Sequence, residues 1–282
     1  MGASTATPVS PALTAWLLEQ AAAGCGPVEL LRAMRASGWD EASARLALAQ
    51  TLPGLPAPMA TVAAPAGPAP VVSPGATQIE LGEQVVQLQF SLALPRVVSL
   101  AGFLSDAECD ELMALAGPRL SRSETVVGET GGSEVNGART SDGMFFARAE
   151  NPLCLRIEQR IADLLHWPVS HGEGLQVLRY RPGAQYLPHH DYFDPAQPGS
   201  ASVLARGGQR VGTLLIYLNT PEAGGATLFP DVGLEVMPRK GHALFFSYPQ
   251  PEAATLTLHG GAPVIRGEKW VATKWLRERE FS

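Results

Sequence analysis

A ten-residue stretch of the chain, YLPHHDYFDP, holds two histidines and two aspartates, although all 282 residues include only six histidines. His189 and Asp191 stand two positions apart, and on an extended strand residues i and i+2 point to the same side. A third candidate, His259, ends the strand-like run TLTLH further along the chain. Two histidines and one carboxylate form the facial triad that binds non-haem Fe(II) and leaves other metal positions open. The three residues therefore predict a metal site, with His190 turned to the opposite side.

Lys269 gives a second indication of a site at this place. It follows His259 by ten residues, so a strand, a turn and a returning strand would bring its ammonium group into the same barrel. A buried lysine needs an anionic partner, and a dicarboxylate that chelates the metal at one end would supply this anion at the other. A polar turn rich in histidine and a surface lysine stay open as alternatives. The neighbours Trp270 and Trp275 favour a buried Lys269.

The composition excludes several classes of protein. Hydrophobic residues make up 45% and charged residues 17% of the chain, which suits a substantial core in one or two domains. The net charge of −6 comes without clustered Lys and Arg, so we expect no nucleic-acid partner. No apolar run reaches the ~18 residues of a membrane span, and the N-terminus lacks the pattern of a secretion signal. Three widely separated cysteines argue against a disulfide framework, so we expect a soluble cytoplasmic protein without a membrane partner.

Residues 1–52 have the pattern of a small helical bundle. The helix-start signals are Ser10-Pro11, Gly26-Pro27 and Asp40. The bundle loosely resembles a ubiquitin-associated type, and it would either dock a protein or serve as an accessory packing unit. Residues 53–76 are rich in Pro and Ala and predict a semi-rigid linker. Residues 77–282 would then form the main domain.

The main domain combines two helices with many short strands. A capping box at Ser105 and Glu108 starts the first helix, and Asn151-Pro152 starts the second. From Leu175 onward the chain alternates between strand-like segments and turn signals. The segments are LQVLRY, GTLLIYLN, ATLFP, LEVMPR, HALFFSY and VIRGEKWVATKWLRE. This order predicts an α+β protein whose core is an antiparallel jelly roll, a double-stranded β-helix, flanked by helices.

Several long motifs, in a fixed order, resemble those of a known family. They are FLSDAECDELM, ARTSDGMFFAR, RIEQRIADLL, GEGLQVLRYRPGAQYLPHHDYF, GGQRVGTLLIYLN, GGATLFP and LHGGAPVIRGEKWVATKW. On these motifs the chain resembles the Fe(II)- and 2-oxoglutarate-dependent dioxygenases of the prolyl 4-hydroxylase type. The resemblance runs from about Val97 to Glu278 and leaves out the N-terminal bundle and the linker.

The resemblance implies a role for each matching residue. The catalytic iron ligands would be His189, Asp191 and His259. Binding of 2-oxoglutarate would involve an ion pair with Lys269 and hydrogen bonds from Tyr180 and Thr227. The peptide substrate would contact Tyr186, Arg210 and Trp275. Two loops would close over the site and exclude water, namely Ser121–Gly137 and Pro195–Gly208.

The implied activity is hydroxylation of an unactivated carbon, with peptidyl-proline 4-hydroxylation as the expected reaction. It would use Fe(II), 2-oxoglutarate and dioxygen, with ascorbate as an accessory reductant and a proline-containing peptide or protein as substrate. Two alternatives stay open: the same chemistry on another residue or a small molecule, and a non-catalytic jelly-roll module that binds a metal or a partner. One departure from the family pattern is Arg277, where better-known members often carry histidine. It leaves the iron site untouched and bears on which peptide is bound.

Overall fold

The computed structural model describes residues 11–23, 25–39 and 75–282, apart from 124, 127–131 and 135–136, with a few positions between 44 and 72. The chain divides into two compact units, Met1–Ala64 and Pro65–Ser282. None of the described helices is long and apolar enough to cross a lipid bilayer.

The first unit contains two described helices, α1 (Pro11–Ala22) and α2 (Pro27–Ala36). Their buried side chains form a small apolar cluster with three residues of the following segment. The cluster consists of Leu17, Leu30, Met34, Ala44, Ala47 and Leu48. Most of the expected third helix lies outside the described residues, so the three-helix bundle stays a prediction.

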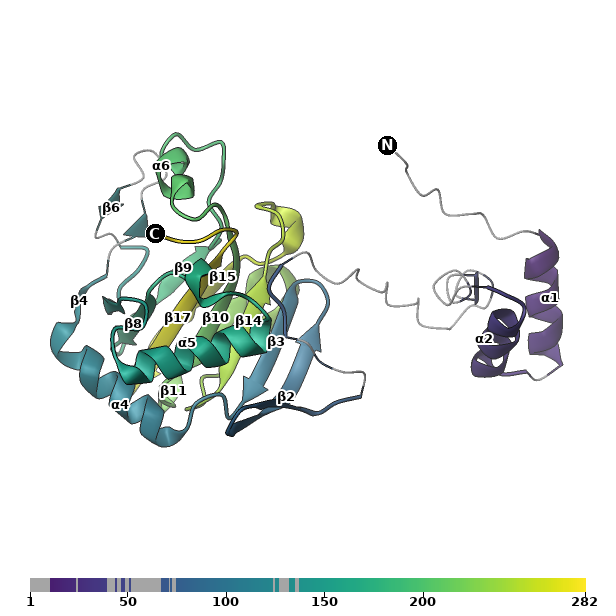
Figure 1. Ribbon diagram of the computed structural model, residues 1–282, viewed down its shortest axis with the longest axis horizontal. Coiled ribbons are helices and arrows are strands. Elements are labelled where there is room, and N and C mark those ends of the chain that lie inside the picture. The colour runs from purple at the N-terminus through teal and green to yellow at the C-terminus, as the bar shows by residue number, and fades with distance from the viewer. Residues whose placement is uncertain are drawn as a thin grey trace. The chain divides into compact units, whose positions relative to one another are not determined.

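The second unit is built on a large antiparallel sheet (Figure 1). In spatial order its strands are β1 (Gln78–Leu81), β2 (Gln84–Leu92), β3 (Arg96–Ala101), β14 (Ala243–Ser247), β10 (Arg210–Tyr217), β17 (Lys269–Arg277), β8 (Leu175–Tyr180), β7 (Asp142–Phe146) and β4 (Ser121–Arg122). A smaller sheet faces it, with the order β13 (Leu234–Val236), β12 (Thr227–Phe229), β15 (His259–Gly261) and β9 (Tyr186–His189). Two short pairs complete the strands: β11 (Ala223–Gly224) with β16 (Val264–Arg266), and β5 (Thr125–Val126) with β6 (Ser133–Glu134).

The chain crosses repeatedly between the two main sheets. It passes from β8 to β9, back to β10, across to β12 and β13, back to β14, across to β15, and back to β17. This alternation is the winding of a jelly roll, and every strand pair is antiparallel. The predicted antiparallel core is therefore confirmed.

Helices α4 (Asp106–Ala116) and α5 (Pro152–Leu165) cover the outer face of the large sheet (Figure 1). Ser105 caps α4 through the predicted capping box with Glu108, and the Glu108 carboxylate also pairs with Arg160 of α5 at 2.9 Å. Helix α5 buries one apolar face at helical spacing, including Cys154, Ile157, Ile161 and Leu165. A third helix, α6 (Ser200–Ala205), lies between β9 and β10. Short 3-10 turns lie at Gly117–Arg119, Val169–His171, Pro230–Val232 and Ala253–Thr255.

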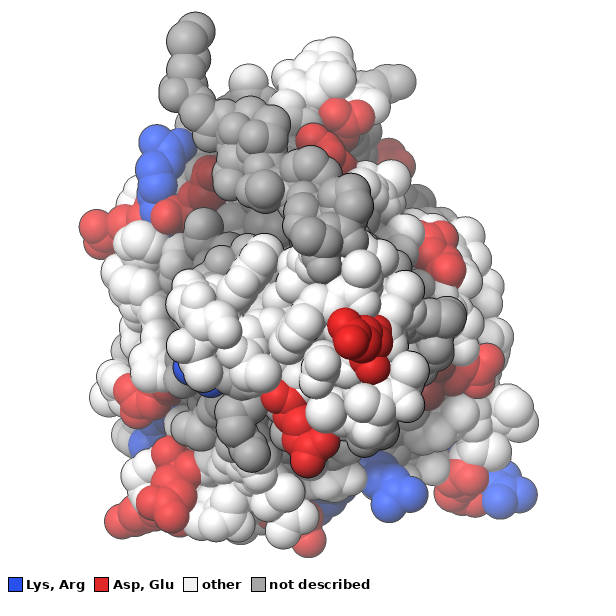
Figure 2. Space-filling model, turned by 90° about the vertical axis from the view of Figure 1, so that its right-hand side faces the viewer, with Lys and Arg blue, Asp and Glu red and all other residues white. Residues whose placement is uncertain are grey.

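Two apolar cores hold this unit together. One lies between the large sheet and the helices, and the other lies between the two sheets around Tyr217, Phe229 and Phe246. Figure 2 shows one face of the whole chain, with the first unit included, and on it acidic side chains are scattered among uncharged ones. Beside the second core, polar side chains from both sheets line a common cavity, among them Thr213, Thr227, His259 and Lys269.

Candidate active site

The structure brings together the three residues predicted to bind metal. His189 ends strand β9 and His259 begins strand β15, and the two face each other across this strand pair. Asp191 lies just beyond the end of β9, so the turn, and not the alternation of the strand as predicted, sets its direction. One ligand atom from each residue lies within 4.8 Å of the others. The Nε2 atoms of His189 and His259 are 3.7 and 3.5 Å from the Asp191 carboxylate oxygens.

The backbone fixes the orientation of both imidazoles. Nδ1 of His189 lies 2.9 Å from the carbonyl oxygen of Leu187, and Nδ1 of His259 lies 3.0 Å from that of Thr257. A carbonyl only accepts, so each Nδ1 carries the proton and each Nε2 keeps a free lone pair. Burial, and then the nearby His189, lowers the pKa of His259 to about 4, which keeps it neutral. The donor set therefore fits a divalent transition metal such as Fe(II).

Asp191 is almost fully buried, with 6% of its surface exposed. Burial raises the pKa of its carboxyl, but His259 and His189 in their protonated form, together with Arg210, place that pKa well below its usual range. Thr213 of β10 donates a hydrogen bond of 2.7 Å to its Oδ2 atom. The carboxylate is therefore ionised and oriented as a metal ligand requires.

Lys269 stands at the start of β17, opposite Tyr180 of β8, and only 4% of its surface is exposed. Burial lowers the pKa of its ammonium group to about 7. No carboxylate in the described part of the chain pairs with it, and its Nζ lies 5.6 and 5.8 Å from the ring centroids of Tyr180 and Tyr217. A buried ammonium group with two aromatic rings nearby and no carboxylate partner among the described residues fits an anionic ligand.

Thr227 lies beside Lys269 and the triad in one small cavity. The hydroxyl of Tyr217 donates a 2.8 Å hydrogen bond to Thr227 Oγ1. The hydroxyl proton of Thr227 is therefore available for an acceptor in the cavity. The lining of this cavity also includes Tyr180, so all three residues predicted to bind 2-oxoglutarate are brought together.

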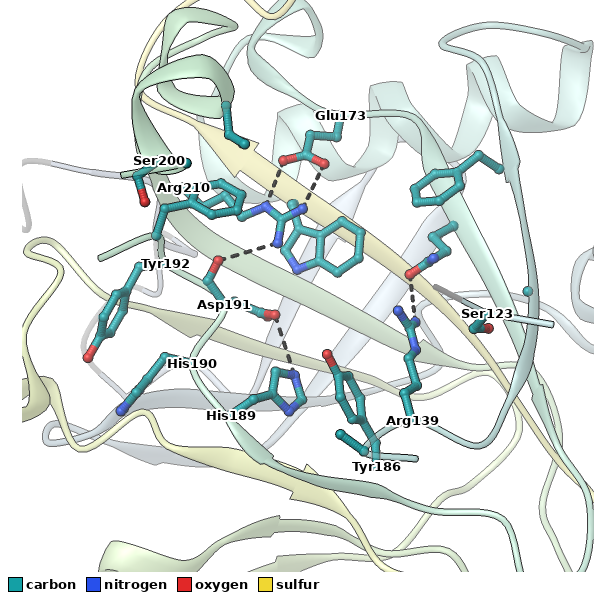
Figure 3. A pocket seen from close by; sticks show the side chains of 18 of the residues that line it. Ser123, Arg139, Glu173, Tyr186, His189, His190, Asp191, Tyr192, Ser200 and Arg210 are labelled. Carbon is teal, nitrogen blue, oxygen red and sulfur yellow. Dashed lines mark hydrogen bonds and ion pairs between the residues drawn. The ribbon is translucent and has the colours of Figure 1, made fainter. Parts of the chain in front are cut away.

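The predicted substrate residues line a neighbouring cavity of about 950 Å³ (Figure 3). Arg210 lies over the ring of Trp275, with 3.9 Å between its guanidinium carbon and the ring centroid. Trp275 Nε1 is buried and has no hydrogen-bond partner within the described residues. The ring of Tyr186 stacks on His189 at 3.7 Å, so Tyr186 links this cavity to the metal site. His190 points away, as predicted, and stacks on Tyr192 at 4.5 Å (Figure 3).

Sequence reasoning missed Glu173, which holds Arg210 with two hydrogen bonds of 2.7 and 2.9 Å (Figure 3). No local pattern around Glu173 marks it, because its partner is 37 residues away. Thr213 was also missed, although a hydroxyl within the apolar run VGTLLIY is a detectable signal. A third missed residue is Arg139, which contacts the ring of Tyr186 at 4.9 Å and donates to Gln176.

Arg277 has a structural role that the sequence does not indicate. Its side chain is completely buried, and its Nη2 donates to the backbone carbonyls of Val203, at 2.6 Å, and Arg206. Its Nη1 lies 3.4 Å from the carboxylate of Glu173. Arg277 therefore connects the segment that contains α6 to the end of β17 and shares Glu173 with Arg210.

The predicted loop Ser121–Gly137 includes β4, β5 and β6, and part of it lies outside the described residues.

Comparison with known proteins agrees with this geometry. Residues 175–277 match the model of the 2OG-Fe(II) oxygenase superfamily. Probable prolyl 4-hydroxylase 3 of Arabidopsis thaliana is 41% identical over 208 residues, which cover 66% of this chain and 71% of that protein. Prolyl 4-hydroxylase 1 of the same plant is 42% identical over 205 residues, which cover 67% of this chain and 71% of that protein. A solved structure, the viral collagen prolyl hydroxylase of Paramecium bursaria Chlorella virus-1, is 31% identical with a TM-score of 0.49, covering 64% of this chain and 95% of that one.

Proposed function

The chain belongs to the prolyl 4-hydroxylases of the 2OG-Fe(II) oxygenase superfamily, and from this membership we propose that it hydroxylates C4 of proline residues in a peptide or protein. It is a dioxygenase that uses Fe(II), 2-oxoglutarate and dioxygen. In the proposed reaction one oxygen atom enters succinate, formed from 2-oxoglutarate with loss of carbon dioxide, and the other converts a C–H bond into C–OH. Bound Fe(II) supplies the redox chemistry of this coupling.

In this proposal His189, Asp191 and His259 hold the metal, and Lys269 holds the far carboxylate of 2-oxoglutarate. The observation that carries it is the buried ammonium group of Lys269, placed beside the triad with no acidic partner among the described residues. Thr227 and Tyr180 would add hydrogen bonds to the same carboxylate. Because the ion pair forms away from water, it would be stronger than a surface pair and would orient the co-substrate.

The larger cavity supports a peptide as the substrate. The indole N–H of Trp275 has no partner in the described structure, and the guanidinium of Arg210 is held rigid by Glu173 and the ring of Trp275. Both are donors of the kind that backbone carbonyls accept, and the aromatic faces of Tyr186 and Trp275 suit a proline ring. The same chemistry on another residue or on a small molecule is the second candidate, which the volume of about 950 Å³ also allows.

Further parts of the proposal concern the rest of the molecule. We propose a jelly-roll dioxygenase domain at residues 77–282, a linker at 53–76 and a helical bundle at 1–52 that docks a protein. We also propose a cytoplasmic location, which three free cysteines support, and ascorbate as an accessory reductant. Fractionation of cells would test the location, and recovery of activity after uncoupled turnover would test ascorbate.

The deciding experiment uses the full chain with Fe(II), 2-oxoglutarate and a panel of proline-containing peptides. We expect peptide-stimulated release of succinate and the gain of one oxygen atom on proline, located by mass spectrometry. Succinate release that no proline peptide stimulates would transfer the proposal to another residue or a small molecule. Absence of both succinate release and metal binding would leave the non-catalytic module as the better interpretation.

A further inference from the structure

A line of three buried polar groups runs from the large sheet to Asp191. The hydroxyl of Tyr248, just after β14, lies 2.8 Å from Thr213 Oγ1, which in turn lies 2.7 Å from Asp191 Oδ2. Tyr248 and Thr213 are each 1% exposed, and Asp191 is 6% exposed. All three are therefore shielded from solvent, and each depends on the next for its hydrogen bonds.

The direction of these hydrogen bonds follows from the chemistry of the groups. An ionised carboxylate only accepts, so the single hydroxyl proton of Thr213 goes to Asp191. The oxygen of Thr213 is then an acceptor, and the phenol of Tyr248 must be the donor to it. Successive hydrogen bonds of one direction polarise one another, so the donor behind Thr213 strengthens its bond to the carboxylate.

The arrangement distinguishes the two oxygens of Asp191. Each oxygen lies near one imidazole, Oδ1 at 3.7 Å from Nε2 of His189 and Oδ2 at 3.5 Å from Nε2 of His259, but only Oδ2 accepts the hydrogen bond from Thr213. Resting on the proposed metal site, we propose that Thr213 and Tyr248 are positioning residues that hold Asp191 as a one-oxygen metal ligand. Ligation through one oxygen leaves more of the metal's positions open for the co-substrate and dioxygen than ligation through both.

Simple packing does not explain the two hydroxyls. Thr213 lies in strand β10, in which Val211 and Leu214 are also buried and are apolar. A valine in place of Thr213 would have the same shape and would leave no polar group in need of a hydrogen bond. Tyr248 belongs to the apolar core between the sheets, where a phenylalanine would avoid burying a hydroxyl. Both hydroxyls are accounted for once the carboxylate of Asp191 is the group that they orient.

The test measures metal affinity without turnover, by calorimetric titration of the full chain with Mn(II) in the absence of oxygen and 2-oxoglutarate. We expect Thr213→Val to raise the dissociation constant about 10- to 100-fold, as loss of an orienting partner of a metal ligand does. Tyr248→Phe should raise it by a smaller factor, about 2- to 5-fold, because only the supporting bond is lost. Thr213→Ser keeps the donor and should restore affinity to near that of the wild type.

Tyr217→Phe is the matched control, since it removes another buried phenol that bonds a threonine, Thr227, which makes no hydrogen bond to Asp191 within the described residues. It should leave Mn(II) affinity unchanged. Three results would each overturn the inference. Thr213→Val could bind Mn(II) as tightly as the wild type, or Thr213→Ser could lose as much Mn(II) affinity as Thr213→Val. The third is that Tyr217→Phe weakens Mn(II) binding as much as Tyr248→Phe does. If the wild type binds no Mn(II) or Fe(II), the proposed function fails with it. If Thr213→Val does not fold, the inference is still tested by the Mn(II) affinity of Thr213→Ser and by the difference in Mn(II) affinity between Tyr248→Phe and Tyr217→Phe.

Discussion

The two ends of the active-site cavity are built in different ways. At the metal end, His189, His259 and Lys269 all belong to paired strands, and both imidazoles are oriented by backbone carbonyls. The groove end is the larger cavity lined by Tyr186, Arg210 and Trp275. There Arg210 is oriented by another side chain, Glu173, and part of the wall is the segment that contains α6, between strands β9 and β10. The two imidazoles are thus oriented by backbone atoms, whereas the guanidinium of Arg210, although it stands on strand β10, depends on a side-chain partner and on a wall formed partly by a loop.

The two ends also differ in how charge is balanced. At the metal end Lys269 has no acidic partner within the described residues, so its ammonium group is balanced only when an anionic ligand binds. At the groove end one carboxylate, Glu173, lies beside the guanidinium groups of both Arg210 and Arg277. We therefore expect changes at the metal end to abolish turnover or co-substrate binding, and changes at the groove end to separate turnover from hydroxylation.

The largest effect should come from His259→Ala. Loss of one of three ligands should abolish metal-dependent succinate release, with or without peptide. The matched control is His190→Ala, because His190 points away from the triad (Figure 3). Succinate release by both variants at similar rates would mean that the triad is misassigned.

Lys269→Ala should affect the co-substrate and not the metal. Loss of one partner of a buried charge pair costs about 3–5 kcal/mol, so we expect the 2-oxoglutarate requirement to rise on the order of 10²- to 10⁴-fold. Titrations with Mn(II) and then with 2-oxoglutarate separate the two affinities. An equal loss of Mn(II) binding would instead assign Lys269 a structural role.

The groove end should respond differently to Arg210→Ala and Trp275→Ala. Both variants should keep the slow, peptide-independent turnover of 2-oxoglutarate but lose hydroxylation about 10²-fold, because the target carbon is no longer held in place. Succinate and hydroxyproline are measured in the same reaction, beside a thermal melt. Parallel loss of both products together with a lower melting temperature would assign these residues to packing.

A smaller effect should appear as a pH dependence at the metal end. The ammonium group of Lys269 is charged below its pKa, which burial lowers to about 7 in the absence of ligand. Above that pH it must take up a proton to pair with 2-oxoglutarate, so affinity should fall by up to about tenfold per pH unit. Calorimetry between about pH 6 and 9 measures this slope. Lys269→Arg should flatten it, since guanidinium stays charged; an equal slope in both proteins would contradict the explanation.

The smallest effect is expected from removing residues 1–64, which belong to the other compact unit. Residues 67–70 should be kept, because the amide of Ala69 donates to the carbonyl of Leu165 on α5. Hydroxylation of short peptides should then stay within about twofold of the full chain, because both ends of the cavity lie in Pro65–Ser282. A truncated chain that precipitates or loses most of its melting temperature would place the bundle in the main core.

The sequence predicts the metal end more completely than the groove end, for a physical reason. Helix starts such as Ser105 with Glu108 depend on neighbours in the chain, and so does the spacing of His189 and Asp191. Thr213 and Glu173 act on partners 22 and 37 residues away, and only folding makes those pairs visible. Even Asp191 was expected on the strand with His189, whereas β9 ends before it. The alternation of side chains along a strand therefore does not predict the direction of the Asp191 side chain, which the turn after β9 sets.

Strand β17 also constrains how this protein can evolve. Lys269 and Trp275 line the cavities, while the alternate residues Trp270, Ala272 and Lys274 face the helices, where Lys274 pairs with Glu158. A single inserted or deleted residue in β17 would exchange the two sets of side chains between the faces. Strand β17 therefore cannot change in length without exchanging these faces, whereas the part of the β9–β10 connection that follows the metal ligand Asp191, Pro195–Gly208, can gain or lose residues without shifting the register of the strands that carry His189, His259 and Lys269. New substrate preferences are thus most accessible to lineages that lengthen or shorten loops, and an insertion scan through both regions would display the contrast directly.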